Sequence, residues 1–366
     1  MKVHYDFNDI LITPAVTSNI RSRKEINPYY LNKDETNWLP IIVSPMDTVI
    51  DTNNWQKFLN EKMSICFPRG ITPDIFKDDD KSVISAFKNV IFFSYSLEQA
   101  SEMAEWLIAN PEKDLEYNIL IDIANGHMQH MVDIVKKLKS RTKVKIMVGN
   151  IANPETYRVL SEAGVDYIRV GIGFGGGCLT AMNTGIGYSM ASLIEQCAYI
   201  KNDLKSENKK YAKIVGDGGF KEYSDIIKAL ALGADYVMLG SILNKCLESA
   251  GETYWSNSLF VINLTKFRVP EWFINILWRK KAKLEKKFRG MSTKEVQKKW
   301  GKKKLTTSEG VVRMRTVKYT LSGWRENFED YLRSSMSYTN SRKLEDFIGK
   351  VNWTVISQNS FGRFNK

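Results

Sequence analysis

Residues 165–187 read VDYIRVGIGFGGGCLTAMNTGIG, and they join an apolar, strand-like run to a glycine-rich loop that ends at a cysteine. The run at 167–172 has the composition of a buried strand. Five of the seven residues from 171 to 177 are glycines, so the backbone can take positive φ and approach a ligand closely. We therefore expect the thiol of Cys178 to meet a substrate at the end of this loop.

Eight apolar, β-rich runs recur along the first 245 residues, with helical patterns between them. They cover residues 41–44, 64–67, 90–95, 119–124, 145–148, 167–170, 213–216 and 236–239. Amphipathic segments lie between them at 52–62, 97–109, 128–140, 154–163, 189–204 and 223–232, and the sequence DDDK interrupts a weaker one at 73–88. This alternation predicts a parallel sheet with right-handed crossovers. Eight strands favour a closed (β/α)8 TIM barrel, an α/β fold, over an open sheet.

The strand ends carry the residues that bear chemistry, because catalytic groups of such barrels lie at the carboxyl ends of the strands. The motifs found there are SPMD, FPRG, DIANG, GN, GIGFGGGC, GDGG and LGS. Loops after strands seven and eight often bind phosphate through backbone amides. We expect Asp217 to hold ribose hydroxyls and the amides of Gly218 and Gly219 to hold phosphate, although a tight turn would explain the same residues.

Composition predicts one large soluble domain over residues 1–366, because 43% of the residues are hydrophobic. No apolar run approaches the ~20 residues that cross a bilayer. The N-terminal sequence lacks a signal core, so we expect a cytoplasmic protein. Cys66, Cys178, Cys197 and Cys246 lie far apart, which argues against a zinc site or a disulfide framework.

The net charge of +12 is concentrated in one block, with thirteen lysines and arginines against two glutamates in residues 278–304. Its first part, EWFINILWRKKAKLEKK, predicts an amphipathic basic helix within a basic insertion at about 255–287. Such a block can be a solvated surface, can bind nucleic acid or a membrane, or can attract an anionic substrate. We expect it to lie beside the catalytic mouth and to speed nucleotide capture at low salt.

Two motifs are better explained without function. GIGFGG matches the dinucleotide fingerprint, and Glu195 follows at roughly the expected distance, but the preceding strand is the sixth and no helix begins at the third glycine. His127 and His130 with Asp133 resemble half a metal site, yet no second pair of ligands is evident, so a solvent-facing helix is favoured. With only His4 besides, acid–base chemistry falls to carboxylates, hydroxyls or arginines.

Taken together, the blocks resemble the IMP dehydrogenase/GMP reductase family. The matching blocks are DFNDILITP near the start, LPIIVSPMDT, IDIANGH, GIGFGGGCLT, IVGDGG, ALALGADYVMLGS, FRGMS, SEG and LRSSMSY, in that order. The resemblance implies a barrel enzyme, a homotetramer, that acts on a purine nucleotide. In it, Cys178 attacks C2 of the purine to give a covalent thioimidate, and a nicotinamide carries hydride to or from that carbon.

The same resemblance implies three groups of binding residues. The substrate group is Asp217, Gly218, Gly219, Gly240, Ser241, Gly290, Met291 and Ser292. The cofactor group, which partly reaches a neighbouring subunit, is Ser22, Arg23, Asp122, Ala124, Ile172, Gly173, Ser334, Ser335 and Ser337. A monovalent cation such as potassium is implied on the carbonyls of Gly173, Gly175 and Cys178.

Within the family the chain looks closer to GMP reductase. It has no room for a regulatory insertion, and its flap-like segment at about 293–310 lacks the Arg-Tyr pair that activates water in the dehydrogenases. Thr180 and Glu309 match the positions that handle ammonia in the reductases. The resemblance thus implies reductive deamination of GMP, or a related purine nucleotide, with NADPH or alternatively NADH. The alternatives are an NAD-dependent IMP dehydrogenase that forms XMP, or an inactive barrel that binds nucleic acid or protein.

The cysteine loop departs from the family pattern GPGSxCTTR. The departures are Phe174, Gly176, Gly177, Leu179 and Ala181. Loss of the serine at Gly176 removes a phosphate contact, and loss of the arginine at Ala181 weakens the cation site. The sequence therefore leaves a ribonucleotide, a deoxyribonucleotide or a modified purine open as the substrate.

Overall fold

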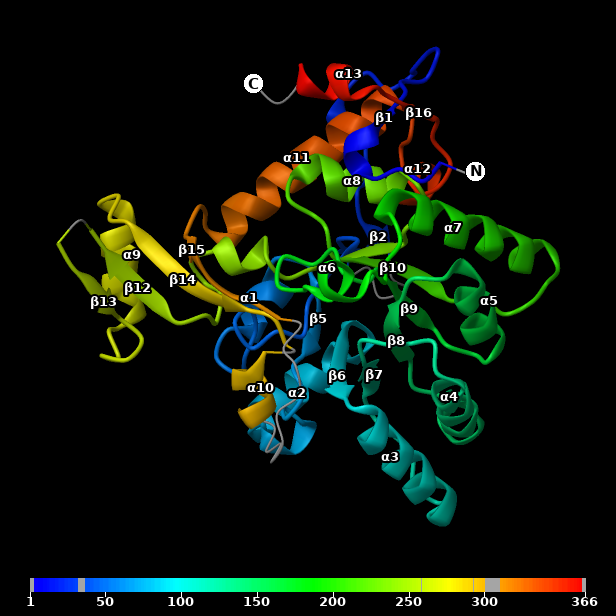
Figure 1. The fold of residues 1–366 in the computed structure, drawn as a ribbon, viewed down its shortest axis with the longest axis horizontal. Helices are drawn as coiled ribbons and strands as arrows, with labels where there is room; N and C mark the ends of the chain where they lie inside the picture. Colours follow the sequence, from blue (N-terminus) through cyan, green and yellow to red (C-terminus); the bar gives the residue numbers. More distant parts are fainter. Residues whose placement is uncertain (1–2, 32–36, 258, 292, 300–309, 364–366) are drawn as a thin grey trace.

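The computed structural model describes residues 3–31, 37–257, 259–291, 293–299 and 310–363, and it contains a closed barrel of eight parallel strands. The strands are β4 (Ile41–Val43), β5 (Ser64–Phe67), β6 (Ile91–Tyr95), β7 (Asn118–Asp122), β8 (Ile146–Ile151), β9 (Tyr167–Val170), β10 (Lys213–Asp217) and β11 (Tyr236–Leu239). Each strand pairs with the next in chain order, and β11 pairs with β4, with Val237 opposite Ile41. The predicted (β/α)8 barrel is confirmed (Figure 1).

Helices follow the strands as the periodicity predicts. They are α1 (Trp55–Asn60), α2 (Asp78–Ala86), α3 (Leu97–Ala109), α4 (Gln129–Arg141), α5 (Pro154–Glu162), α6 (Thr180–Thr184), α7 (Met190–Ser206) and α8 (Tyr223–Ala231). Alternate strand residues face opposite ways, so one set packs against these helices and the other fills the barrel. The interior set is Ile42, Cys66, Phe92, Leu120, Met147, Val215 and Met238. Cys66, Cys197 and Cys246 are buried free thiols.

Helix α2 corrects one expectation. The sequence DDDK does not interrupt a helix but begins it, because Asp78, Asp79 and Asp80 form its first turn. Carboxylates are favourable at this end, where the helix dipole and the unpaired amide groups are positive.

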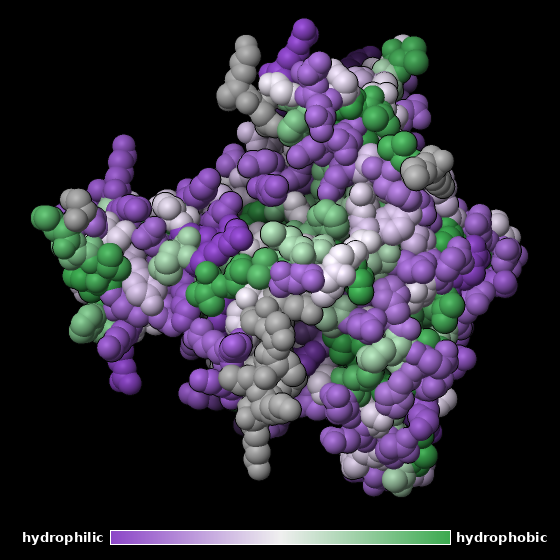
Figure 2. Space-filling view, viewed as in Figure 1, coloured by the Kyte–Doolittle hydropathy of each residue, from purple (hydrophilic) through white to green (hydrophobic). Residues whose placement is uncertain are grey.

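After the barrel, the chain forms a lobe made of β12 (Thr253–Ser256), β13 (Val261–Asn263), α9 (Glu271–Arg279), β14 (Leu284–Arg289) and β15 (Val312–Thr316). Its strands form an antiparallel sheet in the order β13-β12-β14-β15. The lobe projects from the barrel (Figure 1), and apolar side chains gather at its outer end (Figure 2). The exposed apolar residues of the lobe include Leu259, Val261, Phe267 and Trp272.

The prediction of one basic helix through residue 287 is wrong. Helix α9 ends at Arg279, and Lys281 takes a φ of 57°, which turns the chain. The following residues alternate, and Leu284, Lys286 and Phe288 are buried. This period of two is that of a strand with one covered face, and it produces β14.

The C-terminal part packs against helix α8 and ties the two ends of the chain together. It contains α11 (Leu321–Tyr338), α12 (Leu344–Phe347), β16 (Trp353–Val355) and α13 (Gln358–Gly362), with α10 (Lys294–Lys299) before it. Strand β16 pairs with β1 (Ile10–Ile12), so the first and last strands of the chain lie side by side (Figure 1). Two short strands, β2 (Tyr30–Leu31) and β3 (Asn37–Trp38), pair near the N-terminus. In the described part of the chain, no helix has the length and apolar character needed to cross a membrane.

Candidate active site

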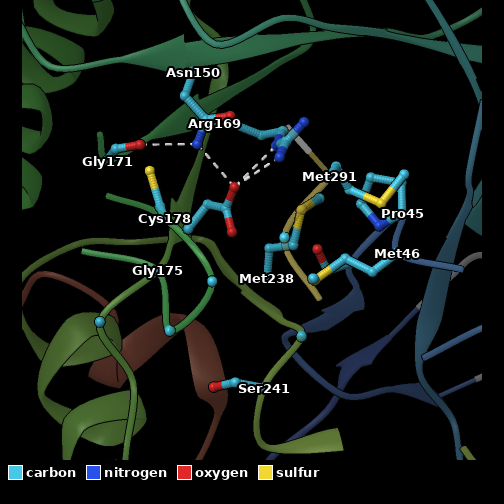
Figure 3. Close-up of a pocket in the computed structure, with 18 of the residues that line it drawn as sticks. Pro45, Met46, Asn150, Arg169, Gly171, Gly175, Cys178, Met238, Ser241 and Met291 are labelled. Carbon is cyan, nitrogen blue, oxygen red and sulfur yellow. Dashed lines mark hydrogen bonds and ion pairs between the residues drawn. The ribbon is translucent and has the colours of Figure 1, made fainter. Parts of the chain in front are cut away.

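A cavity of about 310 Å³ opens at the carboxyl ends of the barrel strands. Its wall contains Cys178 and the ends of several strands (Figure 3). Of the predicted substrate residues, those that line it are Asp217, Gly218, Gly219, Gly240, Ser241, Gly290 and Met291. Ser292 lies outside the described residues. Residues from distant parts of the sequence thus meet in one cavity, as the strand-end pattern predicts.

Cys178 stands partly exposed in this cavity, and its Sγ lies 3.2 Å from the Oγ1 of Thr180. Its own amide donates to the carbonyl of Gly175 at 2.9 Å, which closes the loop into a turn. Burial raises the pKa of the Cys66 thiol, which has no route to a substrate. The thiol of Cys178 is the accessible one, and a hydroxyl lies next to it, as a nucleophile with a proton-transfer partner requires.

The backbone of residues 310 and 311 supports the cysteine loop. Cys178 forms an isolated antiparallel bridge with Gly310, and the amide of Val311 donates to the carbonyl of Gly177 at 3.2 Å. Glu309 itself lies outside the described residues, so its predicted role is untested. The bridge places Gly310, the residue after Glu309 in the sequence, directly beside Cys178.

The floor of the cavity contains a buried arginine between two carboxylates. Arg169 on β9 donates through Nε and Nη2 to the Oδ2 of Asp217, at 3.1 and 2.8 Å, and through Nη1 to the Oδ1 of Asp122 at 2.5 Å. Asn150 adds a hydrogen bond of 2.8 Å to the same Asp217 oxygen (Figure 3). Burial alone would lower the pKa of Arg169, but the two carboxylates raise it overall, so the guanidinium stays charged.

The loop after β10 contains two consecutive glycines with positive φ. Gly218 and Gly219 have φ values of 101° and 85°, which side chains rarely allow. Ser241 lies after β11, and Figure 3 shows it well separated from Cys178 within the cavity. The cavity therefore has a thiol end and a separate end rich in backbone amides and hydroxyl groups.

The predicted cofactor residues fall into two groups. Asp122, Ala124, Ile172 and Gly173 line the cavity. Ser22, Arg23, Ser334, Ser335 and Ser337 do not line it. The N-terminal segment contacts the end of α11, where Ser18 donates to the Ser337 carbonyl at 2.8 Å. The contribution of these five cofactor residues to a neighbouring subunit's site stays a prediction.

The predicted cation site involves only backbone carbonyls. Gly173 and Gly175 line the cavity, but the Gly175 carbonyl already accepts the amide of Cys178. At least one of the three predicted carbonyl ligands therefore already accepts a hydrogen bond. The potassium site stays a prediction. For other metals, the described residues contain no cluster of three His, Cys, Asp or Glu side chains. His127 and His130 are exposed, as the solvent-facing interpretation predicts.

Sequence reasoning missed the residues that organise the floor. Arg169 lies within the run DYIRV, which was assigned only to the barrel wall. A single arginine inside a buried apolar strand was the available indication, because a buried charge requires a partner. Asn150 appeared only as part of a strand end, and Phe288 only as part of the FRGMS block, although both line the cavity.

Comparison with known proteins gives consistent matches. The family model described as the IMP dehydrogenase / GMP reductase domain matches residues 99–262. GMP reductase 1 of Homo sapiens is 29% identical over 366 residues, which cover 96% of this chain and 95% of the human protein. GMP reductase of Phytophthora infestans is 28% identical and covers 98% of this chain. GMP reductase 2 of Bos taurus is 30% identical over 256 residues, 68% of this chain and 71% of the bovine protein.

Proposed function

The chain belongs to the IMP dehydrogenase/GMP reductase family, and from this we propose that it reduces GMP to IMP and ammonia with NADPH as the hydride donor. It is a GMP reductase-like oxidoreductase. The observation that carries the proposal is the partly exposed thiol of Cys178 beside the Thr180 hydroxyl, at the mouth of the barrel. A purine held with C2 next to Cys178 has its ribose and phosphate directed toward the loops after β10 and β11.

The proposed reaction begins when the thiolate of Cys178 adds to C2 of the purine. The C2–N bond then breaks, the amino group leaves as ammonia after protonation, and the purine stays bound to sulfur as a thioimidate. NADPH supplies a hydride to C2 when it is bound in the cavity. The S–C2 bond then breaks, which releases IMP and restores the cysteine.

The remaining residues bind, orient and move protons. Thr180, in contact with Cys178, passes a proton toward the leaving amine, and Glu309 serves as its acid–base partner. Asp217 holds the ribose, with its position fixed by Arg169 and Asn150. Asp122, held by the same arginine, faces the nicotinamide. NADPH in preference to NADH, a potassium ion and a homotetramer are parts of the same proposal.

The test is an assay of NADPH oxidation with a panel of purine nucleotides: GMP, dGMP, AMP, IMP and XMP. We expect oxidation with a guanine nucleotide and release of ammonia. The variant Cys178→Ala should lose turnover and retain nucleotide binding, because the thiol supplies chemistry more than affinity. Cys197→Ala is the matched control, since this buried cysteine lies in α7 away from the cavity.

Two results would remove the proposal. Turnover by Cys178→Ala at the parent rate excludes the covalent mechanism. Reduction of NAD by IMP, with no oxidation of NADPH by any guanine nucleotide, replaces the reductase with a dehydrogenase.

A further inference from the structure

Arg315 on β15 reaches the cysteine loop from the lobe. Its guanidinium carbon lies 4.5 Å from the centre of the Phe288 ring, a cation–π contact that fixes the side chain. A Cβ atom on Gly176 would lie 2.9 Å from its Nη2. Gly176 and Phe288 both line the cavity. The charged end of Arg315 therefore occupies the space beside Gly176 that a side chain on the loop would otherwise fill.

This guanidinium has no anion within the described part of the chain. Arg315 forms no ion pair there, and its buried Nε has no hydrogen-bond partner. Burial lowers the pKa of Arg315, and the charge of Arg313 lowers it further, against a smaller opposite effect of Tyr319. Arg315 is half-buried, and the buried Arg169 of this chain holds carboxylates. A desolvated cation without an anion is costly, so the surroundings of Arg315 favour a bound anion.

A further cation, Lys245, lies close enough to Arg315 and Lys318 to interact with both electrostatically. Burial lowers the pKa of Lys245, and the charges of Lys318 and Arg315 lower it further, while Glu222 offsets part of the effect. Lys245 ends the short helical turn that follows β11, so these cations lie near the loop after that strand. An anion bound there would meet a positive potential before it made any direct contact.

Ser241 indicates where an anion would bind beside Arg315. The Cβ position at Gly176 lies 3.3 Å from the Oγ of Ser241 and 2.9 Å from the Nη2 of Arg315. Both polar groups thus lie within 3.3 Å of one point on the cavity wall. Gly218, in the loop after β10, and Gly240, next to Ser241, line the same cavity. This is the end to which the proposed function directs the nucleotide's phosphate.

We propose that Arg315 binds the 5′-phosphate of the nucleotide and makes the site selective for phosphomonoesters over nucleosides. The inference rests on the proposed function for the identity of the nucleotide, but the phosphate contact is independent of the base. The family pattern has a serine at the position of Gly176, and that hydroxyl is absent here. The guanidinium takes its place, and a charge-assisted hydrogen bond is stronger than that of a neutral hydroxyl.

Gly176 and Arg315 are therefore coupled. A serine at 176 would bring its Cβ to 2.9 Å from Nη2 and displace the guanidinium. If Arg315 is shortened first, the serine has room, and its hydroxyl can take over part of the phosphate contact. Gly176→Ser should consequently weaken nucleotide binding in the parent chain and strengthen it in the Arg315→Gln background.

The experiment measures binding of GMP, IMP, AMP and guanosine by calorimetry to the full chain. We expect Arg315→Gln to weaken binding of all three monophosphates by roughly 10- to 100-fold. Its affinity for guanosine should equal that of the parent. Arg315→Lys should lie between the two. Arg313→Gln is the matched control, because it removes one positive charge from an exposed side chain of the same strand. It should change monophosphate binding by less than about 3-fold.

The outcomes separate this inference from the proposed function. Equal loss of guanosine affinity in Arg315→Gln would mean that the residue only supports the fold. If Arg313→Gln weakened monophosphate binding as much as Arg315→Gln, the effect would come from the overall positive charge of the strand and not from a contact of Arg315 with the phosphate. Unchanged monophosphate binding, or a Gly176→Ser effect of the same sign in both backgrounds, overturns the inference even if the parent reduces GMP. Arg315-dependent binding of all three monophosphates without turnover would leave the inference standing and remove the proposed function.

Discussion

At the scale of single residues, Arg169 connects the two carboxylates that the site needs in fixed positions. Asp122 ends β7 and Asp217 ends β10, so these strands are not neighbours in the barrel. One planar guanidinium reaches both, with its three nitrogens engaged. A lysine offers one point charge and cannot hold two carboxylates in this geometry.

Replacing Arg169 by methionine should destabilise the fold strongly. The change leaves the partly buried Asp217 without its cation and leaves Asp122 with Arg69 alone, and breaking a buried pair typically costs about 3–5 kcal/mol. Urea unfolding of the variant measures this loss directly. Arg158→Met is the control, because Arg158 forms its ion pairs on the surface and its loss should cost about 0–1 kcal/mol. A methionine variant at 169 as stable as the parent would show that the three residues are not coupled.

The residue scale also shows what sequence reasoning can find. Cys178, Asp217 and Ser241 were predictable because strand ends in a barrel converge, whatever their distance along the chain. Arg169 was missed because periodicity describes which side of a strand is covered and not which charges meet there. Arg315 was missed because its contact with Gly176 depends on how the lobe packs, and no local pattern records that contact.

At the scale of elements, β14 shows how one segment can satisfy two patterns. The residues of 271–279 follow a helical period, and those from 284 alternate. If the two segments are considered together, the helical period of the first dominates, and the sequence predicts one helix through both. The alternation buries a lysine, because Lys286 lies between Leu284 and Phe288 on the covered face.

Lys286 should make stability depend on pH in a defined direction. Burial lowers its pKa from 10.5 to about 8, and Glu248 offsets part of this. Between these two values the unfolded chain holds a proton that the folded chain lacks, so the free energy of unfolding rises with pH across this window. Below pH 8, Lys286 is charged in the folded protein as well, and burial of this charge lowers the free energy of unfolding by on the order of 3 kcal/mol.

The variant Lys286→Met removes this dependence. Its melting temperature relative to the parent should be highest near pH 7 and should fall as the pH rises from 8 to 10. Lys283→Met, on an exposed side chain of the same segment, should show a constant difference over that range. A constant difference for Lys286→Met as well would mean that the lysine stays charged in the folded protein.

At the scale of the whole molecule, the positive block is arranged differently from the expectation. Lys286 is buried, and Lys287 is paired with Glu252 and Glu295. The exposed lysines 280, 281 and 283 lie before β14, whereas the cavity residue Gly290 follows it. A strand of this length spans roughly 20 Å. That exceeds the screening length of about 10 Å at 0.1 M salt.

Steering by these three lysines should therefore be weak at ordinary salt. Replacing all three by glutamine should change kcat/KM by less than about 2-fold at 0.1 M salt. At 0.01 M salt, where screening extends to about 30 Å, a decrease should appear, with kcat unchanged. Arg315→Gln, in contrast, should raise KM for the nucleotide at both salt concentrations. A large, salt-independent effect of the triple variant would place these lysines in direct contact with the substrate.

The bridge between Cys178 and Gly310 also has a consequence for the order in which the protein is made. All eight barrel strands have been synthesised once Leu239 has been added, and domains generally fold as units during synthesis. The backbone that braces the cysteine loop, and the arginine that reaches Gly176, come only with residues 310–315. A nascent chain can thus hold a closed barrel whose nucleophile is unsupported and whose anion pocket lacks its cation. Under the proposed mechanism, Cys178 therefore becomes competent only after the lobe has been translated, later than the barrel strands.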